Sequence, residues 1–345
     1  MSTFLDSISD YRSVAFVGLA KNAGKTECLN HVLRMLASKG TRTAVTSIGV
    51  DGESTDAVSA TRKPEITLFE GTVFVTSESF YRTKRLTAEI LSTGDGRTSL
   101  GRLVTARVVI PGKVILAGPP DTATLRDLIR QSQRLDIETM LVDGALSRLS
   151  LGAPEVTDAM VLATGAAIAP SIPEITARTA FACEIMTLPQ TDPATAGALA
   201  DTKRGVWAID SEGNIHDLDI PTALAITTHK EKLFSHGTTI YVAGAVTDKL
   251  LDFLRSQAQA GETTLIMRDF SCMFASPMSY RAFRAKGGRM MVLKGCRLLG
   301  ICVNPTSPQG YRVDSRTLCE AITSKTGFEA IDVMNPCHSN ATRQI

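Results

Sequence analysis

The stretch from Ser13 to Thr26 constrains the fold of this chain more than any other part of the sequence. Ser13–Gly18 is β-branched, aromatic and apolar, which predicts a buried strand, and a loop follows that ends in Gly24-Lys25-Thr26. The next residues predict a helix, because apolar side chains recur there at helical spacing, at Leu29, Val32, Leu33 and Leu36. A strand, a glycine-containing loop and a helix in this order are the context of a phosphate-binding loop.

Each part of this stretch suits a triphosphate. Loop N–H groups and a helix N-terminus favour bound anions. The Lys25 ammonium can reach between the β- and γ-phosphates, and the Thr26 hydroxyl is placed to coordinate Mg²⁺. The alternative is a Gly-Lys-Thr that only begins an ordinary helix. The sequence therefore predicts nucleotide binding by Asn22, Ala23, Gly24, Lys25, Thr26 and Glu27.

The spacing of the loop departs from the common Gly-x-x-x-x-Gly-Lys-Thr pattern, which would need glycine where this chain has Leu19. The nearest glycine is Gly18. This longer loop resembles that of dethiobiotin synthetase and cobyric-acid-synthase-like enzymes, in the MinD/ParA-related (SIMIBI) class of P-loop proteins. The resemblance implies a domain that binds and hydrolyses ATP with Mg²⁺. An Asn-Lys-x-Asp motif typical of many GTPases is absent from the sequence, which favours ATP over GTP.

Length and composition predict two globular domains. The chain has 345 residues, of which 43% are hydrophobic and 21% charged, enough for a sizeable core. A net charge of +2 does not indicate nucleic-acid binding. No signal peptide or membrane-spanning stretch is recognisable. The seven cysteines are scattered, which argues against a disulfide framework or a zinc site and for a cytoplasmic protein.

The order of expected elements predicts an α/β fold, with a doubly wound, mostly parallel sheet in a P-loop domain and a second, smaller α/β domain. The pattern weakens near residues 188–206, so the predicted domains are 1–205 for nucleotide and 206–345 for a partner or substrate. Strands are expected at 41–50, 65–76, 103–109, 113–118, 138–143, 158–166, 223–227, 238–242, 263–267, 289–293 and 298–303. Helices are expected at 27–36, 81–91, 173–186, 249–258, 277–285 and 315–324.

Carboxylates after expected strands are candidates for catalysis and metal binding. Asp51 follows the second strand, where ligands collect in open α/β sheets. In the P-loop class that this chain resembles, an acidic residue here often reaches the metal or the attacking group, so the resemblance implies this role for Asp51; the alternative is a turn residue beside Gly52. Asp143 ends an apolar strand before Gly144 and is the favoured Mg²⁺ ligand. Its rival is Asp121, which equally fits a helix cap.

Three further features have weaker claims. Arg148 could stabilise transition-state charge, although a solvated surface arginine is more common. Thr164 and Gly165 end a strand at the same rim, where small residues also serve packing. The loop 304–311 is rich in proline and glycine and follows an apolar strand, and such loops often bind ligands.

Four segments together carry a closer resemblance: Gly18–Thr26, Ile48–Glu53, Val142–Arg148 and Val303–Pro305. They are similar to the P-loop subunits of lysine 5,6-aminomutase reactivases over nearly the whole chain. This resemblance implies an ATP-driven protein that acts with a MutS-related subunit on an adenosylcobalamin-dependent lysine 5,6-aminomutase; a homodimer is left open. Two other classes stay open: a ligase of the dethiobiotin synthetase type acting on a small carboxylate, and a nucleotide-dependent regulatory switch.

Overall fold

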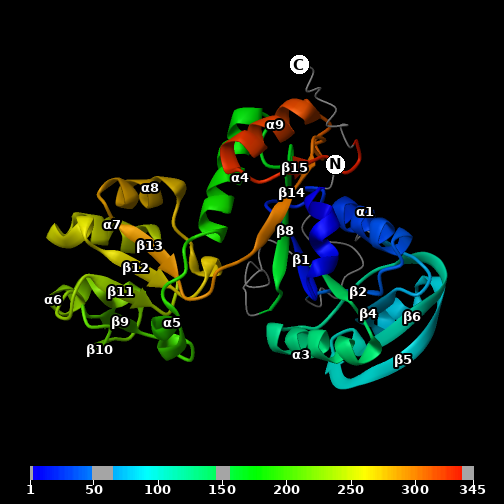
Figure 1. Ribbon diagram of the computed structural model, residues 1–345, viewed down its shortest axis with the longest axis horizontal. Helices are drawn as coiled ribbons and strands as arrows, with labels where there is room; N and C mark the ends of the chain where they lie inside the picture. The colour runs from blue at the N-terminus through cyan, green and yellow to red at the C-terminus, as the bar shows by residue number, and fades with distance from the viewer. Residues whose placement is uncertain (1–2, 49–64, 145–155, 336–345) are drawn as a thin grey trace. The chain divides into compact units, whose positions relative to one another are not determined.

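The computed structural model describes residues 3–48, 65–144 and 156–335, with only the backbone at 95–97. The chain forms two compact units, drawn in Figure 1. The first contains residues 1–182 and 297–345, and the second contains residues 183–296. The second unit is therefore an insertion between two parts of the first.

The first unit is built on a ten-stranded sheet with the order β15-β14-β8-β1-β7-β2-β4-β6-β3, in which β5 pairs with β6. The strands from β15 to β4 are parallel, whereas β6 runs antiparallel to β4, β3 and β5. Their bounds are β1 Ser13–Gly18, β2 Thr43–Ser47, β3 Ile66–Leu68, β4 Val73–Ser77, β5 Arg85–Thr98, β6 Gly101–Val114, β7 Thr139–Asp143, β8 Ala159–Gly165, β14 Leu298–Asn304 and β15 Ala330–Ile331.

Helices cover both faces of this sheet. Core residues on one face, such as Leu29 and Val45, pack with α1, and those on the other, such as Ala44 and Leu125, pack with α3. Neighbouring residues of a strand point to opposite faces, which is why Ala44 and Val45 belong to different clusters. The helices are η1 Phe4–Asp10, α1 Lys25–Ser38, α2 Glu78–Arg82, α3 Thr122–Ser132, η2 Gln133–Leu135, α9 Ser315–Thr326 and α4 Ile172–Met186, which runs into the second unit.

The second unit has a five-stranded sheet with the order β10-β9-β11-β12-β13. Strands β11, β12 and β13 are parallel, and β9 is antiparallel to both β10 and β11. The strands are β9 Val206–Ile209, β10 Ile215–Ile220, β11 Thr239–Val242, β12 Thr264–Met267 and β13 Arg289–Val292. The helices are α5 Pro193–Leu199, η4 Ala223–Thr228, α6 Lys230–Leu233, α7 Asp248–Ser256, η5 Ala258–Gly261, η6 Phe270–Cys272 and α8 Pro277–Ala285.

The expected α/β class with a large, mostly parallel sheet is confirmed, but several elements differ from expectation. The expected helix at 81–91 is wrong, because most of it belongs to β5, which forms a long curved ribbon with β6 (Figure 1). The expected strand at 113–118 is only the end of β6, followed by irregular backbone. Residues 223–227 form a 3-10 helix instead of a strand.

The division into domains also differs from the expected 1–205 and 206–345. Strand β14 pairs in parallel with β8, and β15 pairs with β14, so the chain returns to the first sheet after residue 296. The apolar residues of β14 that predicted a strand in the second domain are buried against β8 instead.

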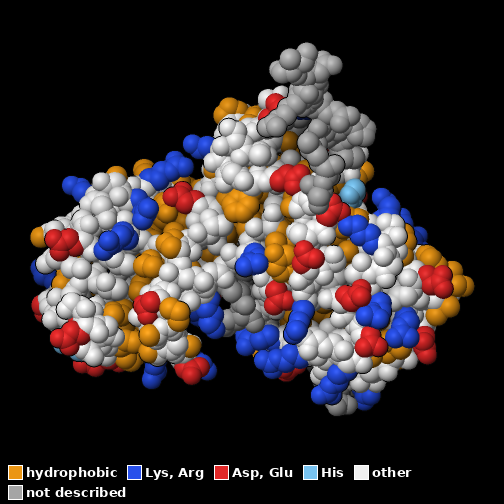
Figure 2. Space-filling model, viewed as in Figure 1, with side chains coloured by type: hydrophobic (Ala, Val, Ile, Leu, Met, Phe, Trp, Pro, Cys, Tyr) orange, Lys and Arg blue, Asp and Glu red, His pale blue; other side chains and the backbone are white. Residues whose placement is uncertain are grey.

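The surface and the helices add two observations. Basic and acidic side chains are interspersed over the face shown in Figure 2. Across the described ranges, no helix is both long enough and apolar enough to cross a bilayer.

Candidate functional site

The loop between β1 and α1 turns at two residues with positive φ. Asn22 has a φ of 63° and Gly24 a φ of 92°, the left-handed region that glycine enters without a Cβ clash. A Cβ on residue 24 would also lie 2.7 Å from Cβ of Asn304, which ends β14. Gly24 is therefore required both by its backbone conformation and by the close approach of β14.

Helix α1 begins at Lys25 and presents free N–H groups to the loop. Its N-cap is Gly24, which has no side chain to accept them. The first hydrogen bond of the helix runs from the Cys28 N–H to the Gly24 carbonyl, at 3.0 Å. The N–H groups of Lys25, Thr26 and Glu27 precede it, and an α-helix offers no intrahelical acceptor to its first N–H groups. The partial positive charge at this helix end favours an anion.

The Lys25 side chain reaches the end of β7. Its Nζ lies 2.8 Å from Oδ1 of Asp143 and donates to the Gly144 carbonyl at 2.5 Å. The two side chains are 23% and 18% exposed, so the ion pair is only partly screened by water. The lysine and the favoured carboxylate, predicted from distant segments, are thus in direct contact.

The sheet places this pair at its carboxyl edge. Strand β7 lies between β1 and β2, and Asp143 is in register with Phe16 on one side and Ser47 on the other. Ligands in open α/β sheets collect at this edge. The carboxyl ends of β1, β7 and β2 therefore lie in one row beside the N-terminus of α1, with the polar side chains of Asp143 and Ser47 on β7 and β2.

Strand β14 contributes a residue that the sequence reasoning assigned to the other domain. The Nδ2 of Asn304 donates to the Asn22 carbonyl at 3.1 Å, which ties the loop to the end of β14. The motif Val303-Asn304-Pro305 was noticed in the sequence, but its position beside the loop depends on the return of the chain to the first sheet. Sequence spacing alone carries no signal of this contact.

A disulfide joins the same two elements. Cys28 in the first turn of α1 and Cys302 in β14 are bonded, with Cα atoms 6.3 Å apart and 274 residues of separation. Both are buried. The sequence predicted no disulfide framework and gave no sign of this single bond, because its two cysteines are remote in sequence and meet only on neighbouring elements. Cys183, Cys272 and Cys296 are free thiols.

Of the remaining candidate carboxylates and cations, some lie outside the described residues and one, Asp121, has a capping role. Asp51 and Arg148 lie outside the described residues. Asp121 is the N-cap of α3 and accepts from the Thr124 N–H at 2.8 Å; this hydrogen bond is the main reason that its pKa is lowered. The structure thus gives Asp121 the capping role that was its alternative reading.

Thr164 has a packing role. Its hydroxyl is fully buried and hydrogen-bonded to that of Thr179 on α4, at 2.7 Å. Its neighbour Gly165 lies so close to β14 that a Cβ would be 1.9 Å from the Asn304 carbonyl oxygen. The end of β8 therefore serves close packing of β8 against α4 and β14.

The donors present fit a magnesium ion bound together with a nucleotide. Mg²⁺ prefers oxygen ligands and commonly takes one or two from the protein, with phosphates and waters completing an octahedron. The Thr26 hydroxyl and the Asp143 carboxylate supply such oxygens. In the parts of the chain that the structure describes, no group of three or more His, Cys, Asp or Glu side chains could hold a metal alone.

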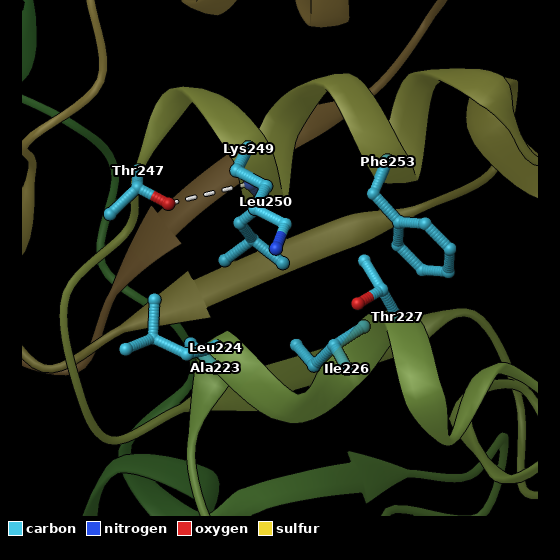
Figure 3. Close-up of a pocket in the computed structure, with 8 residues that line it drawn as sticks. All are labelled: Ala223, Leu224, Ile226, Thr227, Thr247, Lys249, Leu250 and Phe253. Atoms are coloured by element: carbon cyan, nitrogen blue, oxygen red, sulfur yellow. Dashed lines mark hydrogen bonds between the residues drawn. The ribbon is translucent and has the colours of Figure 1, made fainter.

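Two surface pockets lie away from this edge. One, in the second unit between η4 and α7, has a volume of about 10 Å³, room for roughly one water (Figure 3). The other is an open depression of about 360 Å³ at the amino ends of β1, β2 and β7, lined by Arg12, Arg42, Gln133, Asp136, Ile137 and Glu138. Neither includes Lys25 or Asp143.

Comparison with known proteins identifies no relative: no family model matches the chain, and neither a curated protein nor a solved structure matches it significantly.

Proposed function

We propose that the first unit binds ATP with Mg²⁺ and hydrolyses it. The observation that carries the proposal is the contact between Lys25 and Asp143 at the carboxyl edge of the sheet, next to the uncapped N-terminus of α1. A cation for phosphate, a carboxylate for metal and a set of free N–H groups converge there from separate elements. This is the set of groups that phosphoryl transfer uses.

The residues would act mainly by binding and orienting the triphosphate. The N–H groups of Lys25, Thr26 and Glu27 would donate to its phosphate oxygens. The Lys25 ammonium would leave Asp143 and bridge the β- and γ-phosphates, and the freed carboxylate and the Thr26 hydroxyl would hold Mg²⁺. When bound, Mg²⁺ supplies charge neutralisation on the phosphate oxygens. Donors fixed before reaction stabilise developing charge at little reorganisation cost.

The reaction is hydrolysis of the terminal phosphoanhydride bond. A water oxygen bonds to the γ-phosphorus, and the bond to the bridging β–γ oxygen breaks. ADP leaves with the electron pair of that bond, and the proton of the attacking water passes to phosphate or solvent. We assign orientation of the water to Asp51, from its position after β2 in the sequence.

We further propose that hydrolysis acts on a partner enzyme, an adenosylcobalamin-dependent lysine 5,6-aminomutase, together with a MutS-related subunit. The resemblance of four sequence segments supports this partner. ATP and ADP would drive the partner only through different affinities for two conformations.

The test is release of inorganic phosphate from Mg-ATP by the chain alone, with the aminomutase, and with small carboxylates. We expect slow hydrolysis alone and faster hydrolysis with the aminomutase. ADP formation that requires a small carboxylate and yields its ligated product, with no protein partner, would replace this proposal with the ligase alternative. Stimulation of ATP hydrolysis by a protein unrelated to the aminomutase would favour the remaining alternative, a nucleotide-dependent regulatory switch.

A further inference from the structure

Ser47, at the end of β2, occupies the strand position next to Asp143. The two residues are in register on neighbouring parallel strands, so their side chains point to the same face of the sheet. That face is the one covered by α1, since Val45, two residues earlier, packs in the same cluster as Leu29. The Ser47 hydroxyl therefore lies beside the Lys25–Asp143 pair, on the side away from β1.

The side chain of Ser47 accepts one hydrogen bond and keeps its own proton available for donation. Its Oγ accepts from the Gly118 N–H at 3.1 Å. A serine hydroxyl has one proton to donate, and among the described residues this proton has no acceptor. The residue is 8% exposed, so little of it is open to water. An acceptor placed at that edge would complete the hydrogen bonding of Ser47.

Gly118 holds the serine in this orientation. A Cβ at residue 118 would lie 1.8 Å from the Ser47 carbonyl oxygen and 2.5 Å from the Thr46 hydroxyl, so only glycine allows the N–H to approach. The 115–118 segment thus acts as a backbone support for the hydroxyl. No local sequence pattern indicates this contact, because Gly118 and Ser47 are separated by 71 residues.

We infer that Ser47 donates a hydrogen bond to the terminal phosphate of bound ATP. The inference rests on the proposed nucleotide site. The β1–α1 loop and the N-terminus of α1 would hold the inner phosphates, and Lys25 extends from them to Asp143 on β7. Ser47 lies one strand further, where only the outermost phosphate extends. The Ser47 oxygen already accepts from Gly118, and its proton remains to be donated. The terminal phosphate would provide an anionic acceptor for it.

The test compares two matched serine variants by their relative affinities for a non-hydrolysable ATP analogue and for ADP, both with Mg²⁺, measured by calorimetry. Ser47→Ala should weaken binding of the analogue about tenfold or more while changing ADP binding little, because a hydrogen bond to a charged group is lost only in the triphosphate complex. Ser77→Ala is the control. Ser77 is also buried, at the end of β4, but it faces the α3 side of the sheet, and its hydroxyl has no partner among the described residues.

Thermal unfolding is recorded first for each variant. If Ser47→Ala does not fold, Ser47→Cys replaces it, since a thiol has a similar shape and is a weak donor; the same loss of triphosphate preference is expected. An unchanged ratio of the two affinities in a folded Ser47 variant, or an equal loss for both nucleotides, would overturn this inference alone. A wild-type chain that binds neither nucleotide would overturn it together with the proposed function.

Discussion

At the scale of single residues, the proposed site is a set of charges that exchange partners. Nζ of Lys25 and Oδ1 of Asp143 form an ion pair at 2.8 Å. In a nucleotide complex the ammonium would instead contact phosphate, and the carboxylate would bind Mg²⁺. Binding of ATP and of Mg²⁺ should therefore be coupled, because each releases a group that the other needs. The two aspartates that competed for the metal role in the sequence can be separated on this basis.

Asp143→Asn should lower the Mg²⁺-dependent gain in ATP affinity about tenfold or more, since an amide binds Mg²⁺ less well than a carboxylate. ATP affinity without Mg²⁺ should not fall, because Lys25 loses its competing partner. Asp121→Asn should leave both quantities near wild type, since asparagine also caps helices. Calorimetric titrations with and without Mg²⁺ measure this ranking, and the opposite ranking would move the metal to Asp121.

At the scale of elements, local sequence patterns predicted the helices and strands that are built from contiguous residues. They failed for elements that depend on pairing with a strand distant in the sequence. The strand, loop and helix at Ser13–Ser38 are contiguous, so propensity, glycine and apolar spacing agree. The segment 81–91 has helix-compatible spacing, yet β5 forms because β6 offers a long antiparallel partner. Asn304 and Cys302 reach α1 and its preceding loop only through the parallel pairing of β14 with β8, which no local pattern encodes.

The role of β14 in the first sheet predicts the behaviour of a truncated chain. The fragment 1–205 lacks β14 and β15, so β8 loses one of its two parallel partners and exposes buried side chains such as Leu162. We expect it to be unfolded or aggregated by circular dichroism and size-exclusion chromatography.

The matched control for this truncation joins residues 1–182 to 297–345 through a flexible Gly/Ser linker and retains all strands of the sheet. It should fold cooperatively. Cooperative unfolding of the fragment 1–205, with a midpoint equal to that of the linked chain, would contradict the placement of β14.

At the scale of the whole molecule, the insertion of residues 183–296 between α4 and β14 connects the second unit to the first at two points of the chain. One of these connections leads directly into β14, whose end contacts the β1–α1 loop through Asn304. A conformational change of the β1–α1 loop on nucleotide binding could therefore be transmitted through Asn304 and β14 to the chain that enters the second unit. This is the path by which we expect ATP to alter binding of a partner protein.

The central claim is that Lys25 and its surroundings bind a nucleotide triphosphate. The most direct measurement is calorimetric titration of Mg-ATP into the wild-type chain and into Lys25→Ala, after circular dichroism has established that the variant is folded. We expect saturable binding to the wild type and a loss of affinity of roughly 30-fold or more in the variant, since an ammonium–phosphate contact disappears. Equal affinity in the two folded chains, or no binding to the wild type, would contradict it.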